Sequence, residues 1–206
     1  MNNLVHYPRY SIYLIPSKNL FNNLNSFYKK NNFDSGNISQ NTHEIYCTVK
    51  APFYKSDIYS ENDLIDNFNS LKKKDSIQKI LNKTYIAKQY IKLNTNFVLE
   101  LDNDPEFNFI IHDIMRSFDI YRKTLDTSEI KKDLLRFNNL SEKELIYYQI
   151  WGYPYYFECS IHHISFFNFD TKLYNCNFDP VEYESLKLLK QNSSDEYFKE
   201  LANITV

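Results

Sequence analysis

The chain has 206 residues, and 43% of them are hydrophobic, which is enough for a real core and argues against wholesale disorder. The formal net charge is −2 at pH 7, and the longest cationic run is Lys72-Lys73-Lys74, which fits a solvated helix end. Nucleic-acid binding by clustered cations is therefore disfavoured. No stretch approaches the roughly 18 apolar residues of a membrane span, and the N-terminus has no signal-peptide pattern. We therefore expect one soluble, cytoplasmic domain over residues 1–206.

The first predicted elements are strands. The segment 9–15 (RYSIYLI) is rich in aromatic and β-branched residues and stops at Pro16, so it predicts a strand. The segment that follows, which holds Gly36, is predicted to be a loop. A second strand is predicted over 43–53 (HEIYCTVKAPF) and is closed by Pro52. Its alternation separates an apolar face, with Ile45, Cys47 and Val49, from a polar face, with Glu44, Tyr46, Thr48 and Lys50.

The middle of the chain predicts two helices and a hairpin. Leu64, Phe68 and Leu71 recur at helical spacing after Ser60 and Asn62, either of which suits a helix cap. The runs TYIAKQYIKL and FVLEL flank residues 94–95 and predict a β-hairpin. Residues 104–105 (Asp-Pro) then open the clearest helix, whose apolar stripe suits core packing; its members are Phe107, Ile110, Ile111, Ile114, Met115 and Phe118.

The C-terminal third is predicted to hold helices around a long strand. A capping-box pattern at 141–144 opens a helix, and the turn 151–154 (WGYP) ends it. A strand-like run follows over 155–169, and LYNCNF is a candidate to pair with it. Asp179-Pro180 is expected to start a final helical region with Leu186 and Leu189 inward, and Ser194 to cap a last short helix. Grouped strands with helices between them indicate an α+β fold with antiparallel sheets.

The three cysteines indicate buried thiols. Cys47, Cys159 and Cys176 form no C-x-x-C pair, and Cys47 lies on the apolar face of its predicted strand. A free buried thiol behaves as a small hydrophobic group. We therefore expect no structural zinc site.

Two strand segments carry residue types that suit phosphate chemistry. In CSIHHISFF (159–167), alternation places His163 and Ser165 on one face and His162 on the other, much as it pairs Tyr46 with Thr48. A histidine moves protons near neutral pH, and a hydroxyl donates to a phosphate oxygen. Lys50 would offset the phosphate charge. The pattern H-x-S is common by chance, and a half-buried, hydrogen-bonded histidine is the alternative role for His163.

Longer motifs give these strands a context. In chain order they are R-Y-x-I-Y at 9–13, YCTVKAPF at 46–53, FDIYRKTL at 118–125, WGYPY at 151–155 and H-I-S at 163–165. Together they cover nearly the whole chain, and they resemble a bacterial family of phosphonate metabolism proteins, typically encoded beside carbon–phosphorus lyase genes and related to the two-histidine phosphoesterases. K-A-P-F and W-G-Y-P-Y are specific motifs, whereas H-x-T/S alone is not.

The resemblance implies a fold and a reaction. The fold would be two similar lobes of antiparallel sheet with flanking helices, which meet at a central cleft with one H-x-T/S strand from each lobe. Two histidines would act as general base and general acid on a phosphodiester, with no metal and no cofactor. The implied substrate, and the expected partner of the protein, is a small phosphorylated ligand, a cyclic ribosyl phosphate.

One departure from the family pattern bears on catalysis. Tyr46 stands where the pattern has its first histidine, and His43, three residues away, points to the opposite face of a regular strand. A phenol has an ordinary pKa of about 10, so it donates a proton but is a poor base. Losing one acid–base partner typically costs about 10²–10⁴-fold in rate.

Three hypotheses therefore stay open. The protein is a phosphodiesterase with an altered site, in which His163 is the base and Tyr46 donates to the leaving oxygen. Alternatively, it binds a phosphorylated ligand without turnover, or it is an interaction module such as an RNA-end binder. Thr48, Lys50 and Ser165 are the expected phosphate contacts in the first two. Secondary candidates for the cleft are Arg9, Tyr13 and Glu44, and core packing is the equal alternative for Tyr13.

Overall fold

The computed structural model describes residues 8–30, 45–93, 96–102, 104–125, 146, 162–166, 178, 180–193 and 196–206. Its elements, in chain order, are β1 (Arg9–Pro16), α1 (Lys18–Lys30), β2 (Ile45–Tyr54), α2 (Glu61–Leu71), α3 (Asp75–Leu81), β3 (Ala87–Leu93), β4 (Asn96–Leu101), α4 (Pro105–Asp119), β5 (His163–Phe166), β6 (Tyr183–Gln191) and β7 (Lys199–Thr205). The strands form one antiparallel sheet in the order β3-β4-β5-β2-β1-β6-β7. The expected α+β class with antiparallel pairing is confirmed.

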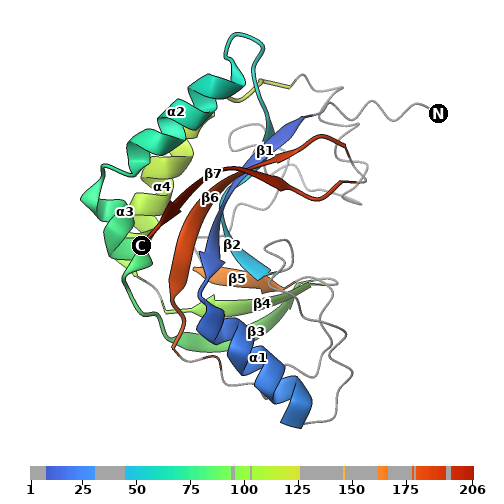
Figure 1. Ribbon diagram of the computed structural model, residues 1–206, viewed down its shortest axis with the longest axis vertical. Coiled ribbons are helices and arrows are strands. Elements are labelled where there is room, and N and C mark those ends of the chain that lie inside the picture. Colours follow the sequence, from blue (N-terminus) through green and yellow to red (C-terminus); the bar gives the residue numbers. More distant parts are fainter. Residues whose placement is uncertain are drawn as a thin grey trace, which may run out of the picture.

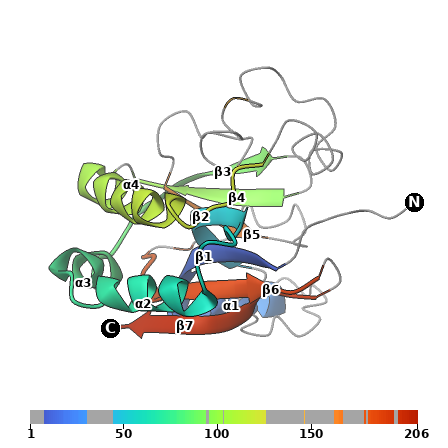
Figure 2. The same ribbon diagram turned by 90° about the horizontal axis from the view of Figure 1, so that it is seen from above.

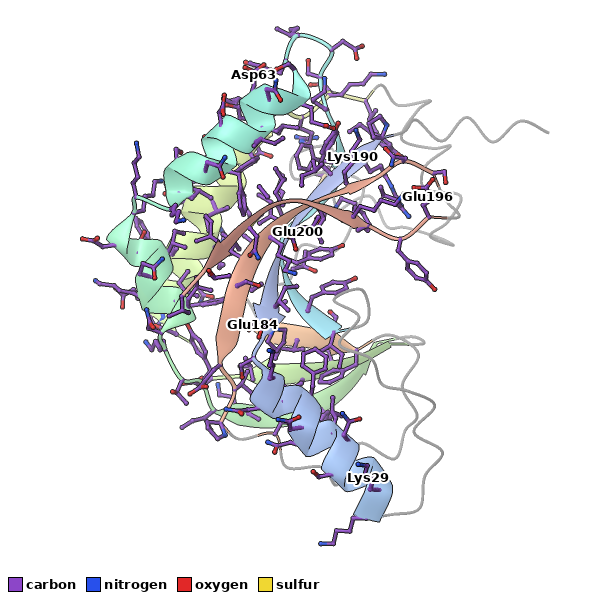
Figure 3. The ribbon with its side chains drawn as sticks, viewed as in Figure 1. Lys29, Asp63, Glu184, Lys190, Glu196 and Glu200 are labelled. Carbon is purple, nitrogen blue, oxygen red and sulfur yellow. The ribbon has the colours of Figure 1, made fainter. Side chains whose placement is uncertain are left out.

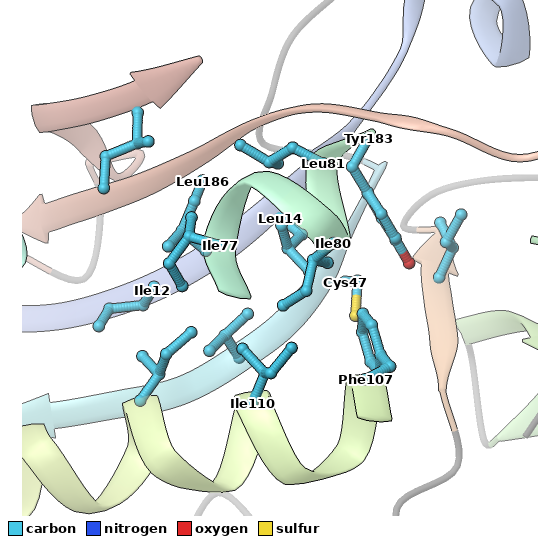
Figure 4. Packing of buried hydrophobic residues seen from close by; sticks show 14 of the residues in the cluster. Ile12, Leu14, Cys47, Ile77, Ile80, Leu81, Phe107, Ile110, Tyr183 and Leu186 are labelled. Atoms are coloured by element: carbon cyan, nitrogen blue, oxygen red, sulfur yellow. The ribbon is translucent and has the colours of Figure 1, made fainter. Parts of the chain in front are cut away.

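The helices α2, α3 and α4 lie on one side of the curved sheet (Figures 1 and 2). Between them and the sheet is a large hydrophobic cluster, part of which Figure 4 shows, with the Cys47 thiol beside the ring of Phe107. Cys47 is a buried free thiol, as expected. A second, smaller cluster contains Tyr13, Ile15 and Leu189. We call the sheet face that carries this second cluster the far face, because its side chains point away from α2–α4.

Local sequence signals account for the helices on the first side. Ser60 caps α2 in a full capping box: its hydroxyl accepts from the Asp63 N–H, and the Asp63 carboxylate accepts from the Ser60 N–H. Asp104 caps α4 and Pro105 fills its first turn, where a missing N–H costs nothing. Every third or fourth residue of α4 is buried, namely Phe107, Ile110, Ile114 and Phe118. The two helices predicted for the middle of the chain, here α2 and α4, and the hairpin of β3 and β4 are confirmed.

The segment after β1 corrects the first expectation. It was predicted to be a loop, yet residues 18–30 form α1. Leu20 and Leu24, one helical turn apart, are fully buried in the large cluster, and Phe27 packs against it. The polar residues between them occupy the other face of the amphipathic helix.

The end of the chain corrects the second expectation. Residues 183–191 and 199–205 are strands, not helices. Leu186 and Leu189 fit helical spacing, but Leu188 is buried as well, because β6 lies inside the sheet between β1 and β7 and buries side chains on both faces. An apolar run buried on both faces cannot be told from a helix by periodicity alone.

The second strand runs further than expected. It passes through Pro52 and ends at Tyr54. Proline has no N–H for a sheet ladder, so it is tolerated at irregular or one-sided positions of a strand. In the described part of the chain, β2 pairs with β5 only at Ile45 and Tyr46, and its register with β1 is irregular between Lys50 and Phe53.

Several expectations concern residues outside the described part of the chain. They are the helix that starts at 141–144, the turn at 151–154, the LYNCNF segment, and the environments of Cys159 and Cys176. None of the helices in the described part of the chain combines the length and the hydropathy that a membrane span requires.

Candidate active site

The two strand segments that the sequence singled out lie side by side in the sheet. Tyr46 of β2 and Ser165 of β5 are register partners in an antiparallel pair, so their side chains share one face. On its other side Ser165 pairs with Val98 of β4. Both Tyr46 and Ser165 are partly exposed. Segments more than a hundred residues apart thus bring a phenol and a hydroxyl together.

The predicted alternation is confirmed for Ile164–Phe166 of β5 and for β2 as far as Thr48. Ile164 and Phe166 of β5 are fully buried in the large cluster, as are Ile45 and Cys47 of β2. Tyr46 and Ser165 therefore face away from that core. This is the far face.

The histidine before β5 anchors the strand from inside. The imidazole of His162 is buried, stacks on the ring of Phe107 at a centroid distance of 3.6 Å, and has its Nε2 2.6 Å from the Tyr183 hydroxyl. Its carbonyl accepts from the N–H of Leu101 at 2.8 Å. Of the two adjacent histidines, His162 thus belongs to the core.

The phenol at position 46 is held by a second tyrosine. The rings of Tyr13 and Tyr46 are parallel, with 3.9 Å between centroids and 2° between planes. Tyr13 itself is 4% exposed and packs in the smaller cluster with Leu189 and the edge of Phe198. Flat stacking of this kind fixes the orientation of the partly exposed ring of Tyr46.

The hydroxyl of Tyr13 lies in a polar environment at the far face. Burial raises the pKa of Tyr13, whereas hydrogen bonding to the side chains of Ser11 and Tyr46 and the charge of Arg9 lower it. The Ser11 hydroxyl also donates to the carbonyl of Lys50 at 2.6 Å. Core packing, one of the two alternatives considered for Tyr13, is confirmed for its ring, and its place in a ligand cleft stays a prediction.

Thr48 occupies the expected face. It is the register partner of Tyr13 and is partly exposed. Since directly opposed residues project to the same side, its hydroxyl joins the far face, which also carries Tyr46 and Ser165.

Lys50 is on the other face, which corrects the expectation from strict alternation. Ile12 pairs with Lys50 but Tyr13 pairs with Thr48, so β2 has one extra residue at Val49. Such a bulge reverses the facing of the residues beyond it, and Val49 and Lys50 are both buried. The Lys50 ammonium pairs with the carboxylate of Asp119 at the end of α4.

The environment of Lys50 is that of a buried structural ion pair. The side chain is fully buried, and burial lowers the pKa of Lys50, while Asp119 raises it. Asp119 also lies 3.6 Å from Nε of Arg122, and the N–H of Lys123 donates to the carbonyl of Tyr54 at 2.7 Å. Contacts between the motif at 46–53 and the motif at 118–125 therefore hold β2 against the end of α4.

Arg9 is a cation that the structure places on the face of the tyrosine pair, as is Lys187, the register partner of Tyr13. Arg9 lies on the same strand face as Ser11 and Tyr13, two and four residues along β1. Its Nε donates to the Gln191 side-chain oxygen at 3.1 Å, and its Nη2 donates to the same oxygen. The Gln191 amide in turn donates to the carbonyl of Glu196 at 2.7 Å, so the guanidinium is held in a fixed position.

Two predicted site residues are described in part or not at all. The backbone of His163 lies in β5, where its register partner is Glu100, and its side chain is outside the description. Glu44 also lies outside the described residues. Sequence reasoning missed Asp119, Gln191 and Glu100, because each becomes a neighbour only through sheet pairing or helix packing. The motif at 118–125 was a signal for Asp119 alone.

The far face thus combines partly exposed hydroxyl groups with a guanidinium. Tyr46, Thr48 and Ser165 supply hydrogen-bond donors, and Arg9 supplies fixed positive charge. Donors of this kind match the non-bridging oxygens of a phosphate, and arginine is well suited to phosphate recognition. The arrangement is chemically suited to an oxyanion.

Fold and site define a mixed α+β protein with one antiparallel sheet whose far face is lined with hydroxyl groups. The chain belongs to the family described as "Protein of unknown function (DUF1045)", whose model matches residues 48–168, more than half of the chain. The match includes Thr48, His163 and Ser165. A search of curated proteins found no match.

Proposed function

We propose that this protein is a metal-independent phosphodiesterase that opens a small cyclic phosphate of the ribosyl type, in phosphonate degradation. The observation that carries the proposal is the register pairing of Tyr46 with Ser165, which joins the two strand motifs of the resemblance on one face. The expected pair of lobes around a central cleft, as in two-histidine phosphoesterases, belongs to this proposal.

The residues have defined roles in the proposed reaction. Thr48 and Ser165 donate to the non-bridging oxygens, and Arg9, in place of Lys50, offsets the phosphate charge. His163 takes a proton from water, the water oxygen bonds to phosphorus, and the phosphorus–oxygen bond of the ring breaks. The leaving oxygen takes the proton of Tyr46, and the proton on His163 returns to the phenolate through solvent. The net change is the addition of one water.

A second candidate function is binding of the same ligand without turnover. It is favoured by the position of Tyr46, whose ring lies flat on Tyr13 and replaces the histidine of the family pattern. A phenol is a weaker acid than an imidazolium by about three pKa units, so transfer to the leaving oxygen is slower. The two functions share one site and differ only in product formation.

The test follows product and binding separately. Cyclic ribose phosphates, including nucleoside 2′,3′-cyclic phosphates, are incubated with the protein in excess chelator and followed by phosphorus NMR. We expect hydrolysis that His163→Ala abolishes and that Lys50→Met leaves unchanged. Ligand-dependent thermal stabilisation without product would support the binding function. Neither product nor stabilisation with any cyclic phosphate would contradict both.

A further inference from the structure

Position 163 of β5 has a carboxylate-bearing residue directly opposite it on the neighbouring strand, β4. The register partner of His163 on β4 is Glu100. Directly opposed residues of an antiparallel pair have Cβ atoms about 4.5–5.5 Å apart and project to the same face. The carboxylate of Glu100 is therefore within reach of whatever side chain position 163 presents.

Glu100 points to the far face. Its neighbours on both sides in β4, Leu99 and Leu101, are 1% exposed and belong to the large cluster on the helix side. Alternation then turns Glu100 away from α2–α4, to the face of Tyr46 and Ser165. It is partly exposed, so its charge is partly shielded from water.

The carboxylate is held in place from its other side. Gln89, the register partner of Glu100 on β3, donates from Nε2 to Oε2 of Glu100 at 2.6 Å. One carboxylate oxygen is thus engaged by Gln89, and among the described residues no hydrogen bond is seen to the other, which can accept a second one. The ladder at this point is also fixed, because the Leu101 N–H donates to the carbonyl of His162.

We propose that Glu100 is a positioning residue for His163: it accepts a hydrogen bond from the imidazole, selects its tautomer and stabilises its protonated form. The inference rests on the proposed function, in which His163 is the general base. A carboxylate behind a catalytic histidine orients the ring and stabilises the imidazolium that forms during proton transfer. Tyr46 on β2 is the other titratable side chain that the described flanking strands place on this face.

The test measures the histidine itself. The chain is labelled with carbon-13 in its five histidines, the His163 signal is assigned with His163→Gln, and the imidazoles are titrated by NMR without ligand. We expect Glu100→Gln to move the titration midpoint of His163 down by about one pH unit, since an opposite charge within about 4–6 Å favours the protonated ring. Glu200→Gln, at the opposite edge of the sheet, is the matched control.

Equal midpoints in the parent, Glu100→Gln and the control would overturn the inference. If Glu100→Gln does not fold, Glu100→Thr removes the same carboxylate with a side chain that favours strands, and it must also lower the midpoint. An unchanged midpoint in that variant would overturn the inference. The titration needs neither substrate nor turnover. An inactive chain with the shifted midpoint would contradict the proposed function alone, and an active chain without it would contradict the role of Glu100 alone.

Discussion

Lys50 and Asp119 form an ion pair that joins the bulge of β2 to the last residue of α4. The lysine is fully buried and the carboxylate is partly exposed. Because the bulge turns Lys50 toward the helices, a cation expected at the phosphate is part of the scaffold. A second ion pair joins β6 to the start of α2, where the Lys190 ammonium lies 2.5 Å from the carboxylate of Glu61. Figure 3 labels Lys190 and, on α2, Asp63.

The first prediction separates the two partners of this ion pair. Asp119→Ala leaves a buried ammonium without its carboxylate and is expected to lower the free energy of unfolding by about 3 kcal/mol. Lys50→Met replaces the charge with an apolar chain of similar length and is expected to change stability by less than about 1 kcal/mol. Urea denaturation followed by circular dichroism measures both. A folded Lys50→Met variant that no longer responds to cyclic phosphates would show instead that Lys50 contacts the ligand.

The second prediction concerns the stacked rings. Tyr13→Phe keeps the stack and removes one hydroxyl, so we expect a loss of about 1 kcal/mol in stability. Tyr13→Ala removes the buried ring under Tyr46 and is expected to cost about 3–5 kcal/mol. Thermal unfolding of both variants provides the comparison. Similar melting temperatures for the two would contradict a structural role of the ring.

The third prediction restores the family pattern. In Tyr46→His the site regains two imidazoles, and we expect the rate of cyclic phosphate hydrolysis to rise by about 10²–10⁴-fold, the usual contribution of one acid–base group. The measurement compares product formation by the variant and the parent at equal protein concentration, with Tyr90→His as a control change elsewhere in the sheet. A variant that binds the ligand yet shows no gain would indicate that Tyr46 is not at the leaving oxygen.

The fourth prediction is a loss of stability at alkaline pH. Burial raises the pKa of Tyr10, Tyr13, Tyr85 and Tyr183 above the ordinary value of 10.0. Below pH 10 these phenols are protonated in both the folded and the unfolded chain, so their full contribution to the free energy of unfolding is present. As the pH rises further, the unfolded chain releases protons that the folded chain retains, and the free energy of unfolding falls.

Urea denaturation between about pH 8 and about pH 11 tests this dependence. Tyr10→Phe, which removes one raised phenol and its hydrogen bond to Glu61, is expected to flatten the decline. Tyr197→Phe alters an exposed ring and is the control. A free energy of unfolding that is constant across this range would contradict the prediction.

Local signals in the sequence determined the elements whose boundaries depend on near neighbours. The Ser60 capping box, the Asp104-Pro105 start of α4 and the alternation of β2 up to Thr48 all follow from contacts within a few residues. The shared facing of Tyr46 and Thr48 was predictable for the same reason, because strand alternation has a period of two. That Ser165 joins them depends on the register of β2 with β5.

Tertiary structure decided what depends on partners distant in the chain. The bulge at Val49 arises from the pairing of β2 with β1, and it alone moves Lys50 from the far face to Asp119. The strand state of 183–191 depends on neighbours at both edges, which override a helix-like spacing of leucines. Likewise, only the register of the sheet places Arg9 opposite Gln191, and only the register places Glu100 opposite His163. The physical reason is that side-chain periodicity belongs to one strand, whereas register and bulges belong to a pair of strands.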